Sequence, residues 1–281
     1  MLFGQPKFFM ENLTTEKLEK LKESLQNMQK TAVAFSGGVD STFLLKVARD
    51  VLGDNAVAVT VRSCLVPRRE LAEAENFCKS NEIRQLFIDA KPLEIPGFDE
   101  NPQDRCYICK RSIFQQIVEL AARHGIAHVC EGSNADDTKD YRPGMKAVSE
   151  LGIQSPLREA ALAKAEIREL SKAMKLETWN KPSFACLASR FVYGEKIDEA
   201  SLKMVEAAEQ FLLDSGFTQM RVRVHGKMAR IEVPPQDFPL MQENAAKING
   251  VLKDLGFSYV TMDLQGYRTG SMNEAFYKGN F

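Results

Sequence analysis

The sequence lacks an excess of charge of either sign. Its 281 residues include 37 Lys and Arg against 38 Asp and Glu, which gives a formal net charge of −1. Proteins that bind long nucleic acids usually carry a surplus of basic residues, because backbone phosphates dominate the affinity. We therefore expect no nucleic-acid partner. The total charge does not exclude a local basic patch.

Long hydrophobic runs are missing as well. No apolar stretch approaches the ~20 residues that a helix needs to cross a bilayer. Residues 1–20 lack the continuous apolar centre and the cleavage site of a secretory signal. We expect a cytoplasmic protein with no membrane partner. In that compartment the six cysteines predict thiols, metal ligands or redox groups rather than structural disulfides.

Short apolar runs alternate with amphipathic segments through the first half of the chain. Strand patterns and helix patterns follow one another at 14–30 (helix), 31–35 (strand), 43–52 (helix), 56–61 (strand), 68–80 (helix), 83–88 (strand), 109–124 (helix) and 127–130 (strand). This alternation predicts a doubly wound α/β fold, in which a parallel sheet is covered on both faces. Ligands of such sheets bind beyond the carboxyl ends of the strands.

The pattern changes after Trp179. A helix pattern over 198–213 precedes a strand pair at 221–224 and 229–233, a helix from Pro234 to about 255 and a strand at 259–264. We predict a first domain over residues 1–194 and a smaller α+β domain over 195–281, which serves substrate binding or oligomerisation. The proline-rich stretch 91–105 predicts a long irregular loop.

The most specific motif is Ser36-Gly-Gly-Val-Asp-Ser-Thr42, between a predicted strand and a predicted helix. Gly37 and Gly38 allow a sharp turn whose amides face an anion, although two glycines alone also fit an ordinary turn. The helix N-terminus adds unsatisfied N–H groups. Hydroxyl donors come from Ser36, Ser41 and Thr42. The Gly-Lys-Ser/Thr ending of a γ-phosphate loop is missing, so we predict a phosphate site of another kind.

Carboxylates accompany this loop. Asp40 falls in the first turn of the predicted helix, where it could cap the helix or hold Mg²⁺ against phosphates, and the sequence does not choose between these roles. Further candidates for an Mg²⁺ or ribose ligand follow the strand at 127–130: Glu131, Asn134, Asp136 and Asp137. The alternative for each of them is a turn with helix-capping carboxylates.

The loop resembles the Ser-Gly-Gly-x-Asp-Ser signature of the PP-loop ATP pyrophosphatase superfamily. This resemblance implies an adenine nucleotide α-hydrolase-like fold that binds the pyrophosphate part of ATP and forms an adenylated intermediate. Further segments are similar to the LarE family: Asp136-Asp137 with Tyr141–Met145, Glu150–Leu157, Lys181–Arg190 and Gly266–Glu274. The likeness to that family runs from roughly Lys30 to Glu274.

The LarE resemblance implies an ATP- and Mg²⁺-dependent sulfurtransferase. Members of the family activate a pyridinium carboxylate mononucleotide as an acyl-adenylate and install sulfur there, in the synthesis of the nickel-pincer nucleotide cofactor. In the best-known type the cysteine at the position of Cys186 gives up its own sulfur. Arg190 could lower the pKa of that thiol or hold a substrate phosphate. The resemblance also implies a symmetric homo-oligomer.

The pair Cys106 and Cys109 departs from the single-cysteine type. Other LarE-like proteins carry this pair and bind an iron–sulfur cluster, so the resemblance implies a [4Fe-4S] cluster on Cys106, Cys109 and Cys186, with one iron open for a replaceable sulfide. The alternatives are a sacrificial Cys186 beside an unrelated pair, and a zinc site, for which no nearby fourth ligand stands at typical spacing. We assign the other cysteines to packing: Cys64, Cys78 and Cys130.

Arg221 and Arg223 alternate along a predicted strand and therefore share one face. Two guanidinium groups suit the phosphate of a mononucleotide, with Glu232 as a partner, and a solvated strand face is the alternative. Three other functions stay open: a PP-loop tRNA thiolase, an amidating enzyme supplied with ammonia by a partner subunit, and a nucleotide-binding module without turnover. Near-neutral charge counts against the first, and the lack of a glutaminase domain counts against the second.

Overall fold

The computed structural model describes residues 5–139 and 144–273 and divides into two compact units. The first unit consists of Met1–Ser63, Arg68–Ala90 and Cys106–Ser183, and the second of Cys64–Pro67, Lys91–Arg105 and Phe184–Phe281. Residues 184–194 thus fall in the second unit, whereas the boundary predicted from sequence lies after residue 194. None of the described helices combines the length and apolar character needed to cross a membrane.

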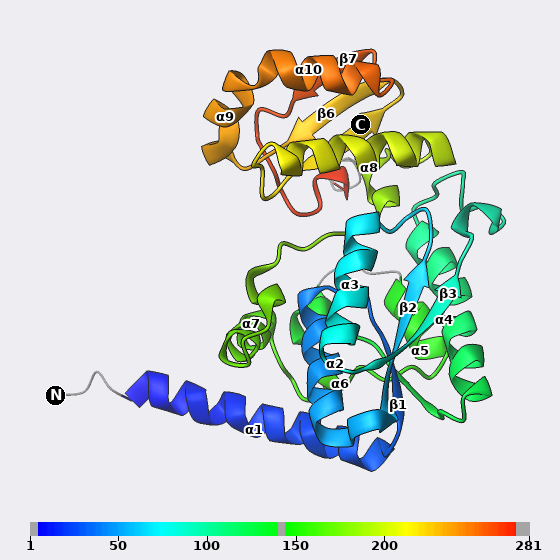
Figure 1. Ribbon diagram of the computed structural model, residues 1–281, viewed down its shortest axis with the longest axis vertical. Helices are drawn as coiled ribbons and strands as arrows, with labels where there is room; N and C mark the ends of the chain where they lie inside the picture. The colour runs from blue at the N-terminus through cyan, green and yellow to red at the C-terminus, as the bar shows by residue number, and fades with distance from the viewer. Residues whose placement is uncertain (1–4, 140–143, 274–281) are drawn as a thin grey trace. The chain divides into compact units, whose positions relative to one another are not determined.

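A four-stranded parallel sheet forms the centre of the first unit (Figure 1). Its strands are β1 (Thr31–Ala34), β2 (Ala56–Arg62), β3 (Arg84–Asp89) and β4 (His128–Cys130), in the order β3-β2-β1-β4. Thr31 pairs with Ala56 on one side and with His128 on the other, so β1 is an inner strand whose carboxyl end meets those of its neighbours. The predicted parallel sheet is confirmed.

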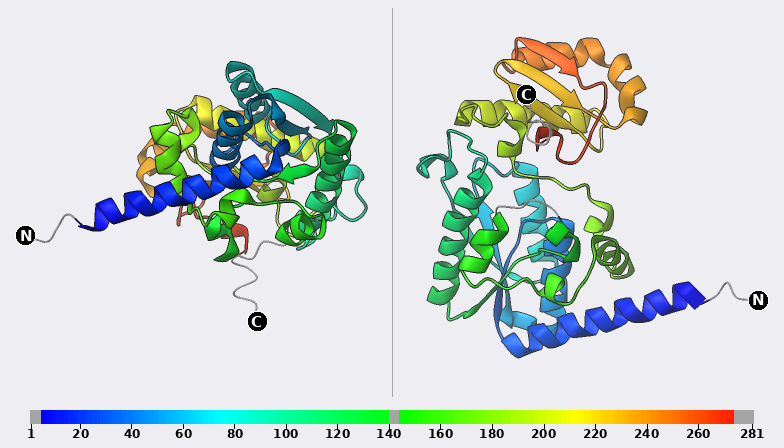
Figure 2. Two further views of the ribbon diagram at one scale, coloured as in Figure 1. Left: turned by 90° about the horizontal axis from the view of Figure 1, so that it is seen from below. Right: turned by 180° about the vertical axis from the view of Figure 1, so that it is seen from behind.

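Helices cover both faces of this sheet, as the doubly wound pattern predicts. They are α1 (Gln5–Met28), α2 (Val39–Leu52), α3 (Arg68–Ser80), α4 (Arg105–Arg123), α5 (Gly144–Glu150), α6 (Pro156–Glu159) and α7 (Lys164–Ala173). Val33 of β1 packs into the apolar cluster with α1, α2 and α3, whereas its neighbour Ala32 packs with α4 and α5 on the opposite face. In Figures 1 and 2 the N-terminal part of α1 reaches beyond the rest of this unit.

The second unit holds a three-stranded sheet in the order β5-β6-β7. Strands β5 (Arg221–His225) and β6 (Met228–Glu232) are antiparallel, and β7 (Tyr259–Met262) runs parallel to β6. The helices are α8 (Glu199–Asp214), α9 (Phe238–Glu243) and α10 (Ala245–Asp254). Asp198 caps α8 by accepting a 2.7 Å hydrogen bond from the Ser201 amide. These elements match the predicted α+β unit.

Three predicted helix boundaries were wrong. Helix α1 begins at Gln5 rather than at residue 14, and the Thr14 hydroxyl donates to Glu166. Helix α4 begins at Arg105, whose amide bonds the Pro102 carbonyl, so it starts four residues earlier than predicted. The helix predicted from Pro234 to about 255 is divided at Asn244, whose side chain bonds the Leu240 carbonyl and competes with the backbone there.

Gly132 lies against the first turn of α2 and has no room for a methyl group. A Cβ there would meet the Ser41 amide nitrogen at 3.0 Å and its Cα at 3.2 Å, both of them backbone atoms. Gly132→Ala should therefore lower the free energy of unfolding by about 1–3 kcal/mol. In α10, a Cβ at Gly250 meets open space, so Gly250→Ala should raise it by about 0.5–1 kcal/mol. Urea unfolding of both variants tests this, and equal stabilities would refute the contact.

Candidate functional site

The phosphate loop lies at the carboxyl end of β1 and leads directly into α2. Gly37 adopts a φ of +72°, which favours glycine, and a Cβ there would lie 3.4 Å from the Ala74 Cβ of α3. Gly38 is the N-cap of α2 with φ −79° and ψ 166°. A Cβ at Gly38 would meet only the Ser36 hydroxyl, at 3.4 Å. The loop is therefore open beside Gly38, and the first-turn amides of α2 have no intrahelical acceptor.

The three predicted hydroxyl donors differ in their burial and in their hydrogen bonds. Ser36 and Ser41 bring their Oγ atoms to 3.1 Å from each other, and Ser41 also donates to the Gly38 carbonyl at 3.3 Å. Thr42 is fully buried, and its hydroxyl has no hydrogen-bond partner among the described residues. Ser36 and Ser41 thus stand at the loop, and the contact of Thr42 with a phosphate stays a prediction.

Asp40 is the charged group of the loop. Its Oδ2 pairs with the Lys164 ammonium at 2.5 Å, while Oδ1 is buried and lacks a partner of good geometry among the described residues. Burial raises the pKa of the Asp40 carboxyl, Lys164 opposes the rise, and the nearby Asp137 adds to it. A buried carboxylate oxygen without a donor, close to a second carboxylate, fits a site for Mg²⁺.

The acidic segment after β4 divides into two kinds of residue. Glu131 is buried and accepts hydrogen bonds from the Ser133 hydroxyl at 2.8 Å and from the Ser155 hydroxyl at 2.6 Å, so it braces the loop internally. Asp136 accepts the Lys164 amide at 2.9 Å and so caps the start of α7. Asp137 accepts the Asn134 amide at 3.0 Å and is close enough to raise the pKa of Asp40.

Two lysines of the first unit escaped the sequence analysis. Lys164 contacts Asp40, and Lys181 donates to the Gly37 carbonyl at 3.1 Å. No signal in the sequence marks Lys164, which reads as an ordinary residue of a helix start. Lys181 belongs to one of the segments that are similar to the LarE family, but the motif alone gave it no role. Tyr141, Arg142, Pro143 and Glu274, named with those segments, lie outside the described residues.

The cysteines differ in exposure: Cys78 and Cys130 are buried, Cys64 and Cys109 are partly exposed, and Cys106 and Cys186 are exposed. Burial raises the pKa of Cys78 and of Cys130 to about 12, and it raises the pKa of Cys64 as well. These thiols are kept protonated, in agreement with a packing role. The three cysteines predicted to react or to bind iron are at least partly exposed: Cys106, Cys109 and Cys186.

Cys106 and Cys109 belong to the first unit and Cys186 to the second. The pair lies in the first turn of α4, three residues apart, so the two side chains share one side of the helix. Three cysteine sulfurs would fit the donor set of a [4Fe-4S] cluster with one open iron. In the part of the chain that the structure describes, no group of three or more His, Cys, Asp or Glu side chains is gathered as around a metal ion.

Arg190 fixes the backbone that carries Cys186. Its side chain is fully buried, with Nε and Nη2 each 2.8 Å from the Glu209 carboxylate. Nη1 donates to the carbonyls of Ala185 at 2.6 Å and Cys186 at 3.2 Å. Burial opposes ionisation of Glu209, but Arg190 holds the pKa of that carboxyl below its usual value. The structure thus engages Arg190 internally, and its contact with a substrate phosphate stays a prediction.

Arg221 and Arg223 lie on β5 and both face the segment that contains Cys186. Arg223 pairs with Glu232 at 2.8 Å and donates to the Ser189 carbonyl at 2.9 Å. The Arg221 guanidinium lies 5.1 Å from the ring centre of Phe184 and 5.3 Å from that of Tyr267. Burial, together with the charge of Arg190, lowers the pKa of Arg221 to about 10. Glu232 neutralises Arg223, and the contact of either arginine with a substrate phosphate stays a prediction.

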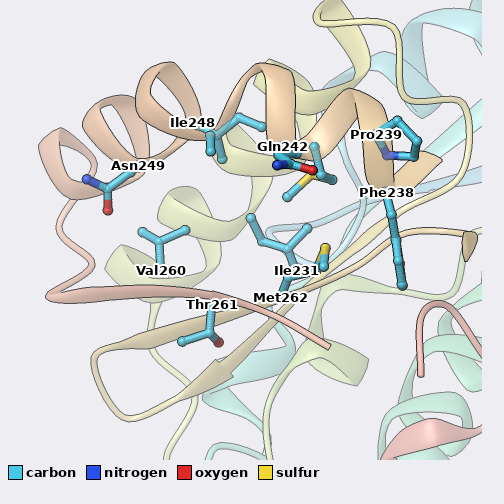
Figure 3. Close-up of a pocket in the computed structure, with 11 residues that line it drawn as sticks. Ile231, Phe238, Pro239, Gln242, Ile248, Asn249, Val260, Thr261 and Met262 are labelled. Atoms are coloured by element: carbon cyan, nitrogen blue, oxygen red, sulfur yellow. The ribbon is translucent and has the colours of Figure 1, made fainter. Parts of the chain in front are cut away.

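A hollow of about 690 Å³ lies elsewhere in the second unit, between α9, α10 and the sheet. Figure 3 shows Ile231, Ile248 and Val260 around it, and its lining is mostly apolar. The predicted site residues are not among those that line it. The first unit therefore holds the phosphate loop with its carboxylates, Cys106 and Cys109, and the second unit holds Cys186 and the arginines of β5.

Comparisons with known proteins show what the chain is similar to. A family model described as NAD synthase matches residues 13–106. The chain is 38% identical over 273 residues to the pyridinium-3,5-bisthiocarboxylic acid mononucleotide synthase of Lactiplantibacillus plantarum, which covers 96% of this chain and 98% of that protein. It is 39% identical over 264 residues to an uncharacterised protein of Synechocystis sp., which covers 93% of this chain and 98% of that protein.

A more distant likeness covers part of the chain. One subunit of the glutamine-hydrolysing GMP synthase of Thermoplasma volcanium is 25% identical over 182 residues, which covers 59% of this chain and 58% of that relative. The likeness to the L. plantarum synthase, in contrast, extends over both units described above. With its PP-loop domain and this full-length similarity, the chain belongs to the LarE family.

Proposed function

We propose that the protein is an ATP-dependent sulfurtransferase that converts a pyridinium carboxylate mononucleotide to the thiocarboxylate, in the synthesis of the nickel-pincer nucleotide cofactor. The observation that carries this proposal is the open phosphate loop beside an Asp40 oxygen that lacks a partner among the described residues, in a chain that also presents an exposed Cys186. The name of the L. plantarum relative supports the choice of substrate. ATP and Mg²⁺ are the other requirements.

Adenylation activates the carboxylate. A carboxylate oxygen attacks the α-phosphorus of ATP, the bond to the β-phosphate oxygen breaks, and pyrophosphate leaves with the electron pair. The amides of the loop and the first turn of α2 stabilise the charge that develops on pyrophosphate. Asp40 and Asp137 would hold Mg²⁺ against the phosphates. AMP is then the leaving group when sulfur replaces it at the acyl carbon.

The second unit would anchor the substrate. Arg221 and Arg223 are assigned to the phosphate of the mononucleotide, because a planar guanidinium matches two phosphate oxygens at once. Arg190 would keep the Cys186 backbone in place through its bonds to two carbonyls. We also propose a symmetric homo-oligomer, which light scattering of the purified protein can measure.

Sulfur delivery is assigned to the exposed cysteines. We propose that Cys106, Cys109 and Cys186 hold a [4Fe-4S] cluster, which when bound supplies an iron that is open to a replaceable sulfide. This proposal requires residues of both units. Its support is the spacing of Cys106 and Cys109 on one side of α4 and the exposure of Cys106 and Cys186. The alternative to be distinguished from the cluster is a Cys186 that gives up its own sulfur.

Substitutions at the two loop glycines test the ATP site. In Gly38→Ala the methyl group fits the folded loop but would meet a bound pyrophosphate, so the KM for ATP should rise at least about tenfold with little change in Tm. In Gly37→Ala the positive φ adds about 1 kcal/mol of strain, so Tm should fall as well. AMP formation with the pyridinium substrate is the assay. A Gly38→Ala enzyme as active as the parent would contradict the assignment.

Iron content tests the cluster. Protein purified without oxygen and reconstituted with iron and sulfide should be brown and hold about four irons per chain. Cys106→Ala and Cys109→Ala should lose most of the iron and the visible absorbance. Cys64→Ala is the matched control, since Cys64 is partly buried and outside the proposed set, and should keep both. Colourless parent protein after reconstitution would rule the cluster out.

The intact mass after one turnover identifies the source of sulfur. If Cys186 is a ligand and the sulfur is replaceable, the polypeptide mass should stay unchanged, because no bond within the side chain breaks. A sacrificial Cys186 would lose one H₂S and become dehydroalanine. Mass spectrometry of the denatured product, with Cys186→Ser as the inactive control, separates these two results.

A further inference from the structure

Lys181 makes three polar contacts within the first unit. Its ammonium donates to the Gly37 carbonyl at 3.1 Å and pairs with Glu70 at 2.7 Å and with Glu73 at 2.6 Å. Both carboxylates belong to α3, but they differ in exposure: the side chain is 8% exposed for Glu70 and 54% for Glu73. Because exposed ion pairs contribute little, Glu70 is the partner that fixes Lys181.

The contact with Gly37 determines where the next amide points. A trans peptide unit is planar, so its carbonyl and its N–H point in opposite directions. When Lys181 holds the Gly37 carbonyl, the Gly38 N–H is turned to the other side, where it donates a long hydrogen bond of 3.4 Å to the Ser36 hydroxyl. That side is the open side of the loop, where a Cβ at Gly38 would meet no other atom within 4 Å.

The backbone of Lys181 is anchored independently of its side chain. Arg168 of α7 donates to the Trp179 carbonyl at 2.7 Å and to the Lys181 carbonyl at 2.9 Å. The same helix carries Lys164, which pairs with Asp40. Helix α7 therefore reaches the phosphate loop twice, through Lys164 at Asp40 and through Arg168 and Lys181 at Gly37.

We propose that Lys181 is a positioning residue, which aims the Gly38 amide at the pyrophosphate by holding the Gly37 carbonyl, with Glu70 orienting the ammonium. This inference rests on the proposed function, because it assigns pyrophosphate to the loop. Lys181 lies on the far side of the Gly37 peptide and does not need to touch the ligand. Its effect on the anion is transmitted through one peptide plane.

Lys181 could instead act only through its positive charge near the loop. Substitutions of Glu70 and Glu73 distinguish this electrostatic effect from positioning. Glu70→Gln removes a negative charge close to the anion site, so electrostatics alone predicts tighter binding of pyrophosphate. Positioning predicts weaker binding, because the ammonium loses its buried partner. Glu73→Gln removes the same charge at an exposed position and is the matched control.

The experiment measures binding of magnesium pyrophosphate by calorimetry in the full-length protein, with Tm recorded for each variant. We expect Kd to rise about tenfold or more in Lys181→Met, about threefold to tenfold in Glu70→Gln and less than about twofold in Glu73→Gln. Lys181→Arg, which keeps a donor for the carbonyl, should recover part of the loss. Tm should fall in Lys181→Met, which leaves the buried Glu70 without its ammonium, and should change little in Glu73→Gln.

Binding in Lys181→Met that equals the parent's, or tighter binding in Glu70→Gln, would overturn the positioning role. If Lys181→Met does not fold, Glu70→Gln and Lys181→Arg decide the question. Failure of the proposed function looks different: the parent would bind pyrophosphate but release no AMP from ATP and the pyridinium substrate. The two hypotheses can therefore fail separately.

Discussion

The structure depends on one constraint, the open first turn of α2 at the carboxyl end of an inner strand. Amides at this turn have no acceptor in their own helix, and a parallel sheet brings its other loops to the same edge. Residues from other parts of the first unit contact that turn. Asp40 meets Lys164, Gly132 packs on the backbone of Ser41, and Lys181 meets the Gly37 carbonyl. Protein groups thus hold the loop, which is open beside Gly38.

The second unit follows a related principle with buried cations. Arg190 and Arg223 each have a buried glutamate as partner, and both also donate to carbonyls of the segment around Cys186. A buried arginine needs such partners, because an unpaired charge in the interior is costly. The same groups that satisfy the arginines therefore fix an irregular segment of backbone. The exposed thiol of Cys186 thereby gains a defined position at the start of a 3-10 turn, Leu187–Arg190.

Much of the fold could be predicted from the sequence because its signals are local. Gly37 and Gly38 mark the end of a strand and the start of a helix, and the apolar period over 68–80 predicted α3 at its observed bounds. The start of α1 was missed because Phe8, Phe9 and Met10 are consecutive and show no helical spacing. The break at Asn244 was missed because a side chain competing for a carbonyl leaves no mark in the apolar pattern.

The site was predictable in its motifs but not in its pairings. The Ser-Gly-Gly-x-Asp-Ser loop was found by residue type and spacing, and Cys106, Cys109 and Cys186 were singled out by the resemblance to the LarE family. Lys164 was not, because its partner Asp40 lies 124 residues away in the chain and nothing local announces the contact. For the same reason Arg190 was read as a group for substrate, whereas its partner Glu209 lies on α8.

The closeness of Gly37 to Ala74 constrains sequence change on a helix that never meets the ligand. A methyl group at residue 37 would already lie at contact distance from the Ala74 side chain. A larger residue at position 74 would press on the turn itself and tilt its peptide planes. The size of the side chain at position 74 of α3 therefore limits which sequences can keep this loop geometry. Substitutions at positions 37 and 74 should covary.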